Sequence, residues 1–501
     1  MQPLPNRTGP RPRRGGVIAS VAVVAVLVAL VAVSTDRGSL RLVRATRSDA
    51  AVTTEVTDTT GTTGTTSLPP DDTWPTIPPG SIPVATLPVE SIPVETMPVE
   101  TLPPVVDDPD LALADPNLFV SLLPQLVGAP APSWVHQGTR LTYDATAVSV
   151  PGSYHEYVED DDGGWVDPAT GDHYRQVDIP GAAGHGLNQV TVTSLTDSLA
   201  ALSIRAFGFI DLDSSNPVTT LSWGGSVGLP GAGADYWLDV DVLAGVDEVV
   251  SSGVKVVRMP YLLDGTEYRS IWVQLIGDDG NFTWVYDLDS GVLLHTSSST
   301  TGPPITGPVA EGEGRDGSTF LTQSTLVGVR DIDLPWADDA APSWITSIDH
   351  FEYTGSVTVE VAGTPSAQLG ADLTVDRIAS TDDWARYRFA RTLSTTVSPS
   401  VTEYVERVDG PAQVAAMFVP PDGLAALGVG QVLDDDPLTG ATVSVAAIEP
   451  TDVDTYITIV EQGPAEQSEL VYELSSGLLV SSTSTDLHLG TTIRLDLVSW
   501  S

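Results

Sequence analysis

The amino-acid sequence predicts an all-β to β-rich α+β fold. It would consist of two tandem, related domains of antiparallel sheet, each a sandwich or a curved half-barrel with one or two short helices, after a disordered stalk. Three observations predict this architecture. The chain contains an internal repeat, both copies are rich in short segments that alternate apolar and polar residues, and helical patterns are scarce.

The internal repeat is visible in two segments. Residues 131–135 (APSWV) return as 341–345 (APSWI), and residues 285–294 (VYDLDSGVLL) return as 471–480 (VYELSSGLLV). Five segments match in the same order, and the copies are expected to close on Trp336 and Trp500. The pattern indicates a duplication, with domains at 129–337 and 338–501.

The spacing between matched residues changes along the chain. It is 210 residues from Tyr143 to Tyr353, 183 from Val190 to Leu373, 186 from Tyr286 to Tyr472, and 164 between the two closing tryptophans. The first copy is therefore predicted to carry one insertion of 27 residues before Val190 and a second of 22 residues after position 300. The shared core of roughly 155 residues has the size of a single domain.

The N-terminus predicts export from the cytoplasm. Residues 1–16 contain four arginines and no acid, and residues 17–34 are apolar apart from two serines. Two interpretations stay open: a single-pass membrane anchor with residues 1–16 in the cytoplasm, or a signal peptide cleaved near the small residues at 32–34. Either places the rest of the chain outside the cytoplasm, membrane-anchored or secreted.

Residues 35–128 are predicted to form a disordered, Thr/Pro-rich stalk. Residues 53–66 are dominated by threonine, and residues 81–100 repeat a five-residue unit with proline at its third position. Proline at this spacing forbids helix and favours an extended spacer. The stalk either lifts the domains away from a membrane or is a solvated linker without a length requirement.

Charge and cysteine content exclude several functions. Residues 48–501 carry 65 acidic residues against 14 basic ones, which makes nucleic acid and anionic lipid headgroups poor partners. The absence of cysteine excludes disulfides, thiol catalysis and cysteine-based metal sites. The partners that remain open are an unknown protein, glycan or lipid ligand.

Strands and helices are predicted from local patterns. Residues 189–195, 202–207, 271–275 and 455–460 alternate with a period of two, as half-buried strands do. The two best helix candidates begin at Asp241 and Asp422, each a suitable N-cap before a short apolar run. The tryptophans at the domain ends are expected to pack in the core or at a sheet edge.

Signatures of catalysis are weak, and we predict a protein that is not an enzyme. Residues 224–228 spell G-x-S-x-G, but the glycines and proline that follow cannot form the helix this motif needs. Residues 252–255 spell S-x-x-K, but Lys255 is the only lysine, so the companion K-T-G motif is missing. The seven histidines show no metal-binding spacing.

One cluster in the first insertion is a candidate binding element. Residues 154–174 hold seven carboxylates and four aromatic residues. Carboxylates can chelate Ca²⁺, the only cofactor that the sequence suggests, and aromatic side chains beside them can stack on a sugar ring. The alternative is an ordinary acidic hairpin that turns at 167–171. The candidate metal ligands are Asp160, Asp161, Asp162, Asp167 and Asp172, and the candidate ligand-binding residues are Tyr157, Trp165 and Tyr174.

The early Trp134, the Leu-x-Tyr strand at 141–143 and the late hairpin around 286–294 together resemble bacterial periplasmic half-barrel carriers of lipids or lipoproteins. The resemblance covers a few short hairpins. It implies an apolar groove closed by the short helix in each copy, and carriage of a hydrophobic ligand.

The function predicted first is that of an extracytoplasmic, membrane-anchored binding or structural protein of the cell surface. The alternative is a carrier of a hydrophobic ligand, and a hydrolase ranks third because no nucleophile, base or metal set recurs in both copies.

Overall fold

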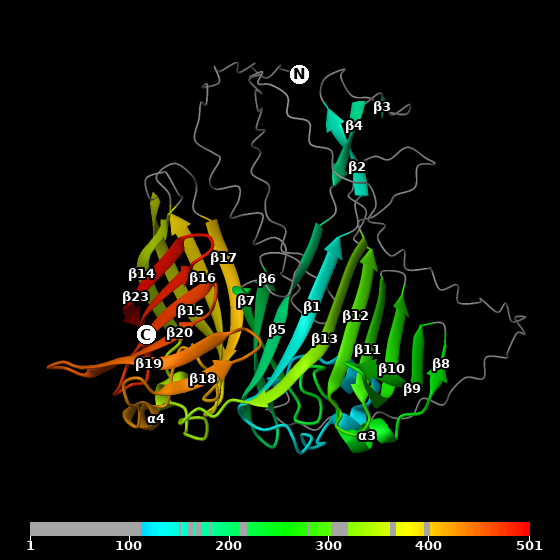
Figure 1. Cartoon of the computed structure of the whole chain (residues 1–501), viewed down its shortest axis with the longest axis horizontal. Helices are drawn as coiled ribbons and strands as arrows, with labels where there is room; N and C mark the ends of the chain where they lie inside the picture. The colour runs from blue at the N-terminus through cyan, green and yellow to red at the C-terminus, as the bar shows by residue number, and fades with distance from the viewer. Residues whose placement is uncertain are drawn as a thin grey trace, which may run out of the picture. The chain divides into compact units, whose positions relative to one another are not determined.

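The computed structural model describes residues 112–149, 152–158, 165–166, 173–179, 182–209, 218–251, 253–277, 280–301, 319–360, 367–394 and 401–501 (Figure 1). It is β-rich, with two 10-stranded antiparallel sheets and few short helices, so the predicted fold class is confirmed. The predicted anchor at 17–34 and the proline-rich part of the stalk lie outside the described residues. No described helix has the length and apolar character that crossing a bilayer requires.

The two sheets have the same strand order. The first runs β7 (Val218–Gly228), β6 (Ala200–Phe209), β5 (Ala182–Leu195), β1 (Thr139–Ser149), β13 (Thr319–Asp331), β12 (Leu293–Thr301), β11 (Gly280–Asp287), β10 (Thr266–Gly277), β9 (Val254–Leu263) and β8 (Val249–Val250). The second runs β17 (Val401–Asp409), β16 (Ala385–Ser394), β15 (Ala367–Ser380), β14 (His350–Val359), β23 (Thr491–Trp500), β22 (Leu479–Asp486), β21 (Glu466–Glu473), β20 (Thr455–Gln462), β19 (Ala441–Pro450) and β18 (Val432–Asp436). Among the described residues, each sheet draws its strands from one copy of the repeat.

Equivalent hydrogen bonds hold the same tryptophan and tyrosine side chains in place in both copies. The indole N–H of Trp134 donates to Ser290 O, and that of Trp344 donates to Ser476 O, both over 2.7 Å. Tyr143 and Tyr353 donate to the carbonyls of Leu293 and Leu479, at 3.2 and 2.7 Å, and Tyr286 and Tyr472 donate to the carbonyls of Asp235 and Ala416, both at 2.9 Å. Conservation of these buried contacts between the copies supports the duplication.

The strand registers correct the spacing predicted for Val190. Leu141 pairs with Val190, and its counterpart Phe351 pairs with Val375. Val190 therefore corresponds to Val375, 185 residues later, rather than to Leu373 at 183. A slip of two residues keeps every side chain on its own face of the sheet, so the apolar pattern cannot reveal it.

The closing tryptophans are not equivalent, which is a second correction. Phe351 pairs with Trp500, whereas Leu141 pairs with Val329, so Trp500 corresponds to Val329. Trp500 is 54% exposed, but Trp336 is fully buried in the core of the second sheet. Trp336 instead lies 210 residues after Leu126, which is buried in the core of the first sheet.

Residues before the first sheet also belong to the packed structure. Helix α2 (Leu118–Leu122) and the 3₁₀ helix η2 (Pro124–Leu126) precede β1, and Asn117 caps α2 by accepting from Val120 N–H. Phe119 packs edge-on against Trp284 and Tyr286 in the core. The packed region thus begins before residue 129, where the sequence had placed the end of the stalk.

The two predicted short helices exist, but they begin earlier than predicted. Helix α3 (Val240–Ala244) is capped by Asp239, whose side chain accepts from Val242 N–H, and Asp241 lies in the first turn. Helix α4 (Pro421–Ala425) follows Pro420, with Asp422 in its first turn. A carboxylate in the first turn interacts favourably with the helix dipole but does not cap the helix. This explains why both aspartates resembled N-caps in the sequence.

Candidate functional site: a polar seam between the sheets

The two sheets meet through different faces. On β5, Val190 and Val192 are buried in the core of the first sheet, so Gln189 and Thr191, which alternate with them, lie on its outer face. On β20, Ile459 is buried in the core of the second sheet, and Glu461, two residues on, lies on that same face. The outer face of the first sheet therefore packs on the core-bearing face of the second, and we call this contact the seam.

A buried charge cluster crosses the seam. Asp434 on β18 lies 2.9 Å from Arg140 Nη1 and 2.7 Å from Arg330 Nη1, and its side chain is 6% exposed. Asp436 lies 3.4 Å from each arginine and accepts a hydrogen bond from Gln189. Burial lowers the pKa of Arg140, whose guanidinium the two carboxylates keep charged. Burial alone would raise the pKa of Asp436, but the Gln189 hydrogen bond and the two arginines lower it overall.

A stack of rings and guanidinium groups forms the second part of the seam. Arg205 lies 4.6 Å from the ring of Phe207 and 4.5 Å from that of Trp223. Arg407, from the second sheet, covers Trp223 at 4.7 Å and Phe389 at 4.8 Å. Arg205 also forms an ion pair with Glu461. Each cation–π contact contributes roughly 0.5–2 kcal/mol, more when desolvated, so Trp223 joins the two sheets.

Backbone segments approach closely at two glycines. A Cβ on Gly225 of β7 would lie 2.3 Å from Val408 N on β17, and a Cβ on Gly410 would lie 2.7 Å from Thr193 O. Ala412 N–H donates to Thr193 O over 3.1 Å. Both sites need glycine because a side chain would separate the sheets.

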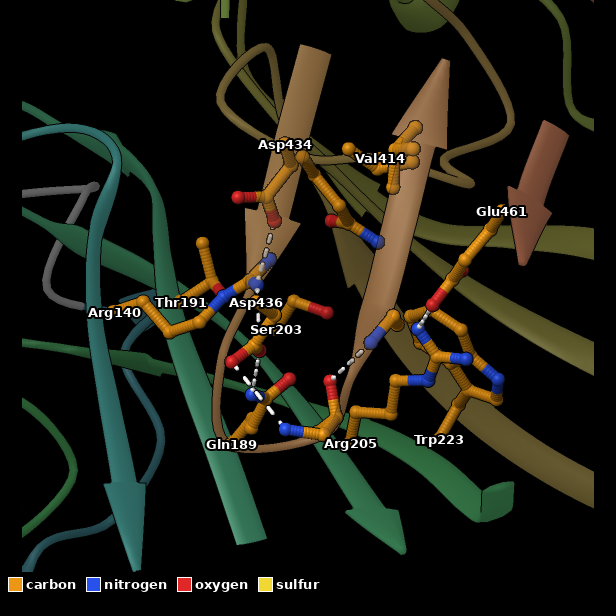
Figure 2. A pocket seen from close by; sticks show the side chains of 14 residues that line it. Arg140, Gln189, Thr191, Ser203, Arg205, Trp223, Val414, Asp434, Asp436 and Glu461 are labelled. Carbon is orange, nitrogen blue, oxygen red and sulfur yellow. Dashed lines mark hydrogen bonds and ion pairs between the residues drawn. The ribbon is translucent and has the colours of Figure 1, made fainter. Parts of the chain in front are cut away.

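The seam encloses a small polar cavity (Figure 2). Its volume is about 30 Å³, and its lining includes Arg140, Gln189, Arg205, Trp223, Asp436 and Glu461. Glu461 Oε2 and Gln413 Oε1 are buried acceptors with no hydrogen-bond partner among the described residues. A volume of this size accommodates one or two water molecules, which could satisfy such acceptors, but no organic substrate. The arrangement joins the two sheets through paired charges and stacked rings.

The candidate binding element in the insertion forms a separate three-stranded sheet, ordered β2-β4-β3. Its strands are β2 (Gly152–Val158), β3 (Trp165–Val166) and β4 (His173–Ile179). Tyr174 pairs with Tyr157 on one side and with Trp165 on the other, so the register brings these three residues together. The five candidate metal ligands, Asp160, Asp161, Asp162, Asp167 and Asp172, lie outside the described residues. Within the described part of the chain, no group of three or more metal-binding side chains occurs.

The structure describes one residue of interest from each weak catalytic motif, Ser226 and Lys255, and both lie on strands. Ser226 of the G-x-S-x-G segment lies within β7 and donates to Asp115 over 2.7 Å. Lys255 lies on β9, and Ser252 is outside the described residues.

Two histidines are expected to titrate on opposite sides of the ordinary value. The hydrogen bond to Asp376 raises the pKa of His350, whereas burial lowers the pKa of His295. The contribution of His350 to stability is therefore present below the unfolded-state pKa and lost as pH rises through the higher folded value. Protonation of His295 instead destabilises the fold as pH falls. A ¹H–¹³C NMR titration would measure both, and a midpoint for His295 at or above that of His350 would contradict this expectation.

Comparisons with known proteins identify no relative by sequence. No family model and no curated protein matches the chain. Among solved structures, a protein of unknown function of the DUF3598 family from Nostoc punctiforme aligns with a TM-score of 0.12 and 8% identity, covering 71% of this chain and 95% of that one. The outer membrane protein OmpT of Vibrio cholerae aligns with a TM-score of 0.09 and 9% identity, covering 72% and 99%. Scores this low carry no argument about fold or function.

The residues of the seam were missed in the sequence because their partners lie far apart along the chain. A signal was nevertheless present. Only 14 basic residues follow position 47, and five of them meet at the seam: Arg140, Arg205, Arg330, Arg386 and Arg407.

Proposed function

We propose that the chain is an extracytoplasmic, membrane-anchored binding protein of the cell surface, in which the first copy binds the ligand and the second copy supports it. The N-terminal apolar segment and the stalk support the location. The observation that carries the division of labour is the asymmetric seam, because the second sheet uses part of its core-bearing face to hold the first sheet.

The first copy has a different surface at the corresponding positions. Tyr286 pairs with Ile271 as Tyr472 pairs with Ile457, so Glu461 on β20 corresponds to Leu275 on β10. Val254 pairs with Leu275 as Val443 pairs with Glu461. Glu461 of the second copy, which forms an ion pair with Arg205 of the first sheet, is therefore replaced by the apolar Leu275 in the first copy.

Aromatic residues extend this apolar surface, which we define as Val254, Leu275, Phe282 and Trp284. All four side chains are half-buried. Phe282 and Trp284 stack with their ring centres 6.0 Å apart and an interplanar angle of 21°. Apolar and aromatic side chains that remain partly accessible are typical of ligand contact surfaces.

This apolar surface favours a second candidate function, carriage of a hydrophobic ligand by the first copy. The three-stranded sheet of the insertion belongs to the same copy and offers Tyr157, Trp165 and Tyr174 in adjacent register for a ligand with a polar or sugar portion. Both features support a single binding copy, and the nature of the ligand separates the two candidates.

Titration of the full chain with a fluorescent fatty acid tests the apolar surface. We expect Leu275→Asp to weaken binding at least about tenfold, because a charge would be placed in the contact at a cost of more than 1.4 kcal/mol. Ile276→Asp is the matched control, since Ile276 is the next residue on β10, lies on the opposite face and is 47% exposed. Equal effects of the two variants, or no binding by the unmodified chain, would contradict carriage of a hydrophobic ligand. Binding through the three-stranded sheet of the insertion would then be the remaining candidate.

A further inference from the structure

The short segment Leu113–Asp115, here called the strap, lies on the seam. Asp115 N–H donates to Val227 O over 2.8 Å, and Asp115 Oδ2 accepts from Val227 N–H over 2.9 Å and from Ser226 O–H over 2.7 Å. Asp115 is thereby attached to β7, the edge strand of the first sheet.

The same carboxylate reaches the second sheet. Asp115 Oδ1 lies 2.7 Å from Arg386 Nη2 on β16, with side-chain exposures of 22% and 18%. Although burial alone would raise the pKa of Asp115, Arg386 and the hydrogen bonds from β7 lower it overall. One side chain of the strap therefore holds a residue from each sheet, at a site where a charge without its partner would be costly.

Apolar contacts of the strap also span both sheets. Leu113 and Ala114 pack against a cluster formed by Leu199, Ala201 and Val227 of the first copy with Trp384 and Val408 of the second. Strands β7 and β17 are edge strands of separate sheets and are not hydrogen-bonded neighbours. The contact between them consequently depends on side chains and on the strap.

We propose that the strap holds the two sheets together at the seam and connects this contact to the preceding stalk. The strap lies within the segment 35–128 that the sequence predicted as the stalk, so tension transmitted along the preceding residues would act first on the contact between the two sheets rather than on either core. The contacts stand on the geometry alone, and only the use of this device in an anchored protein rests on the proposed function.

Hydrogen–deuterium exchange of the full chain tests the proposal through Asp115→Ala and Arg386→Ala. Asp115→Ala removes the carboxylate that accepts from Val227 N–H, whereas Arg386→Ala removes only the ion pair that holds this carboxylate against the second sheet. We expect the amide of Val227 to exchange at least about tenfold faster in both variants, and the Arg386→Ala result reports on the ion pair itself. The amide of Val190, in the core of the first sheet, should keep its rate. Arg388→Ala is the matched control, because Arg388 lies on the same strand and the same face as Arg386 and pairs with Glu406 at 2.8 Å, but it is half-exposed.

Two outcomes would overturn the strap. In one, Arg388→Ala accelerates the Val227 amide as much as Arg386→Ala does. In the other, Asp115→Ala accelerates Val190 and Val227 equally, which would mean a general loss of stability. Fatty-acid binding, measured on the same variants, reports on the proposed function independently, because the apolar surface lies on β9, β10 and β11.

Discussion

Replacement of Asp434 by alanine is expected to lower the free energy of unfolding by about 3–5 kcal/mol, the usual cost of removing one partner from a buried ion pair. Asp434 accepts from both Arg140 and Arg330, whose side chains are 12% and 24% exposed. Without it, two guanidinium groups would share only Asp436, at 3.4 Å from each.

Asp435→Ala is the control for this prediction. Asp435 is the next residue of β18, is exposed, and accepts from Thr442 Oγ1 over 3.3 Å, a contact expected to contribute little. Urea denaturation of both variants, followed by tryptophan fluorescence, would give the difference. Losses that agree within about 1 kcal/mol would show that the charge cluster does not hold the seam.

Gly225→Ala is expected to destabilise the protein by about 1–3 kcal/mol, the usual cost of inserting atoms into a closely packed site. The new methyl group would lie 2.3 Å from Val408 N and 2.7 Å from the side chain of Val408, so the sheets would have to move apart. The loss should appear as earlier unfolding and as faster exchange of seam amides.

Gly224→Ala is the matched control for the close approach. Gly224 precedes Gly225 on β7 and faces the other way, and a Cβ there meets nothing nearer than 4.0 Å. This substitution should be neutral or slightly stabilising, because alanine restricts the unfolded chain. If both variants were neutral in thermal denaturation, the contact of β7 with β17 would be looser than the structure has it.

The duplicated β fold could be predicted from the sequence because the alternation of apolar residues and the repeated hairpin both follow from local pattern. The register could not, as Val190 shows, because a slip of two residues leaves every apolar side chain on the same face of the sheet. The irregularities of β5 and β15, between Val192 and Ser194 and between Arg377 and Ala379, lie at corresponding positions and mark the true alignment only once the pairing is known.

The seam was beyond prediction for a different reason. Its pairs join residues such as Arg205 and Glu461, which are 256 positions apart and have no local signature. Once the register is known, a comparison of the copies points to the seam, because two of its arginines are not repeated. Arg140 corresponds to His350, and Arg205 corresponds to Ala390. A scarce charge that is present in one copy and absent from the other marks a contact between copies better than it marks a catalytic group.

The unequal faces at the seam also constrain how the duplication can have diverged. Two identical units related by a twofold axis would bury the same surface on both units. Here the first unit contributes the outer face of its sheet, and the second contributes its core-bearing face, which we call the socket. Such a head-to-tail contact uses a different face of each unit, so the first unit keeps the face with which the second unit binds it. On that face, Leu275 takes the place of the Glu461 that the socket carries. The corresponding place on the first copy is therefore apolar and suited to a different contact.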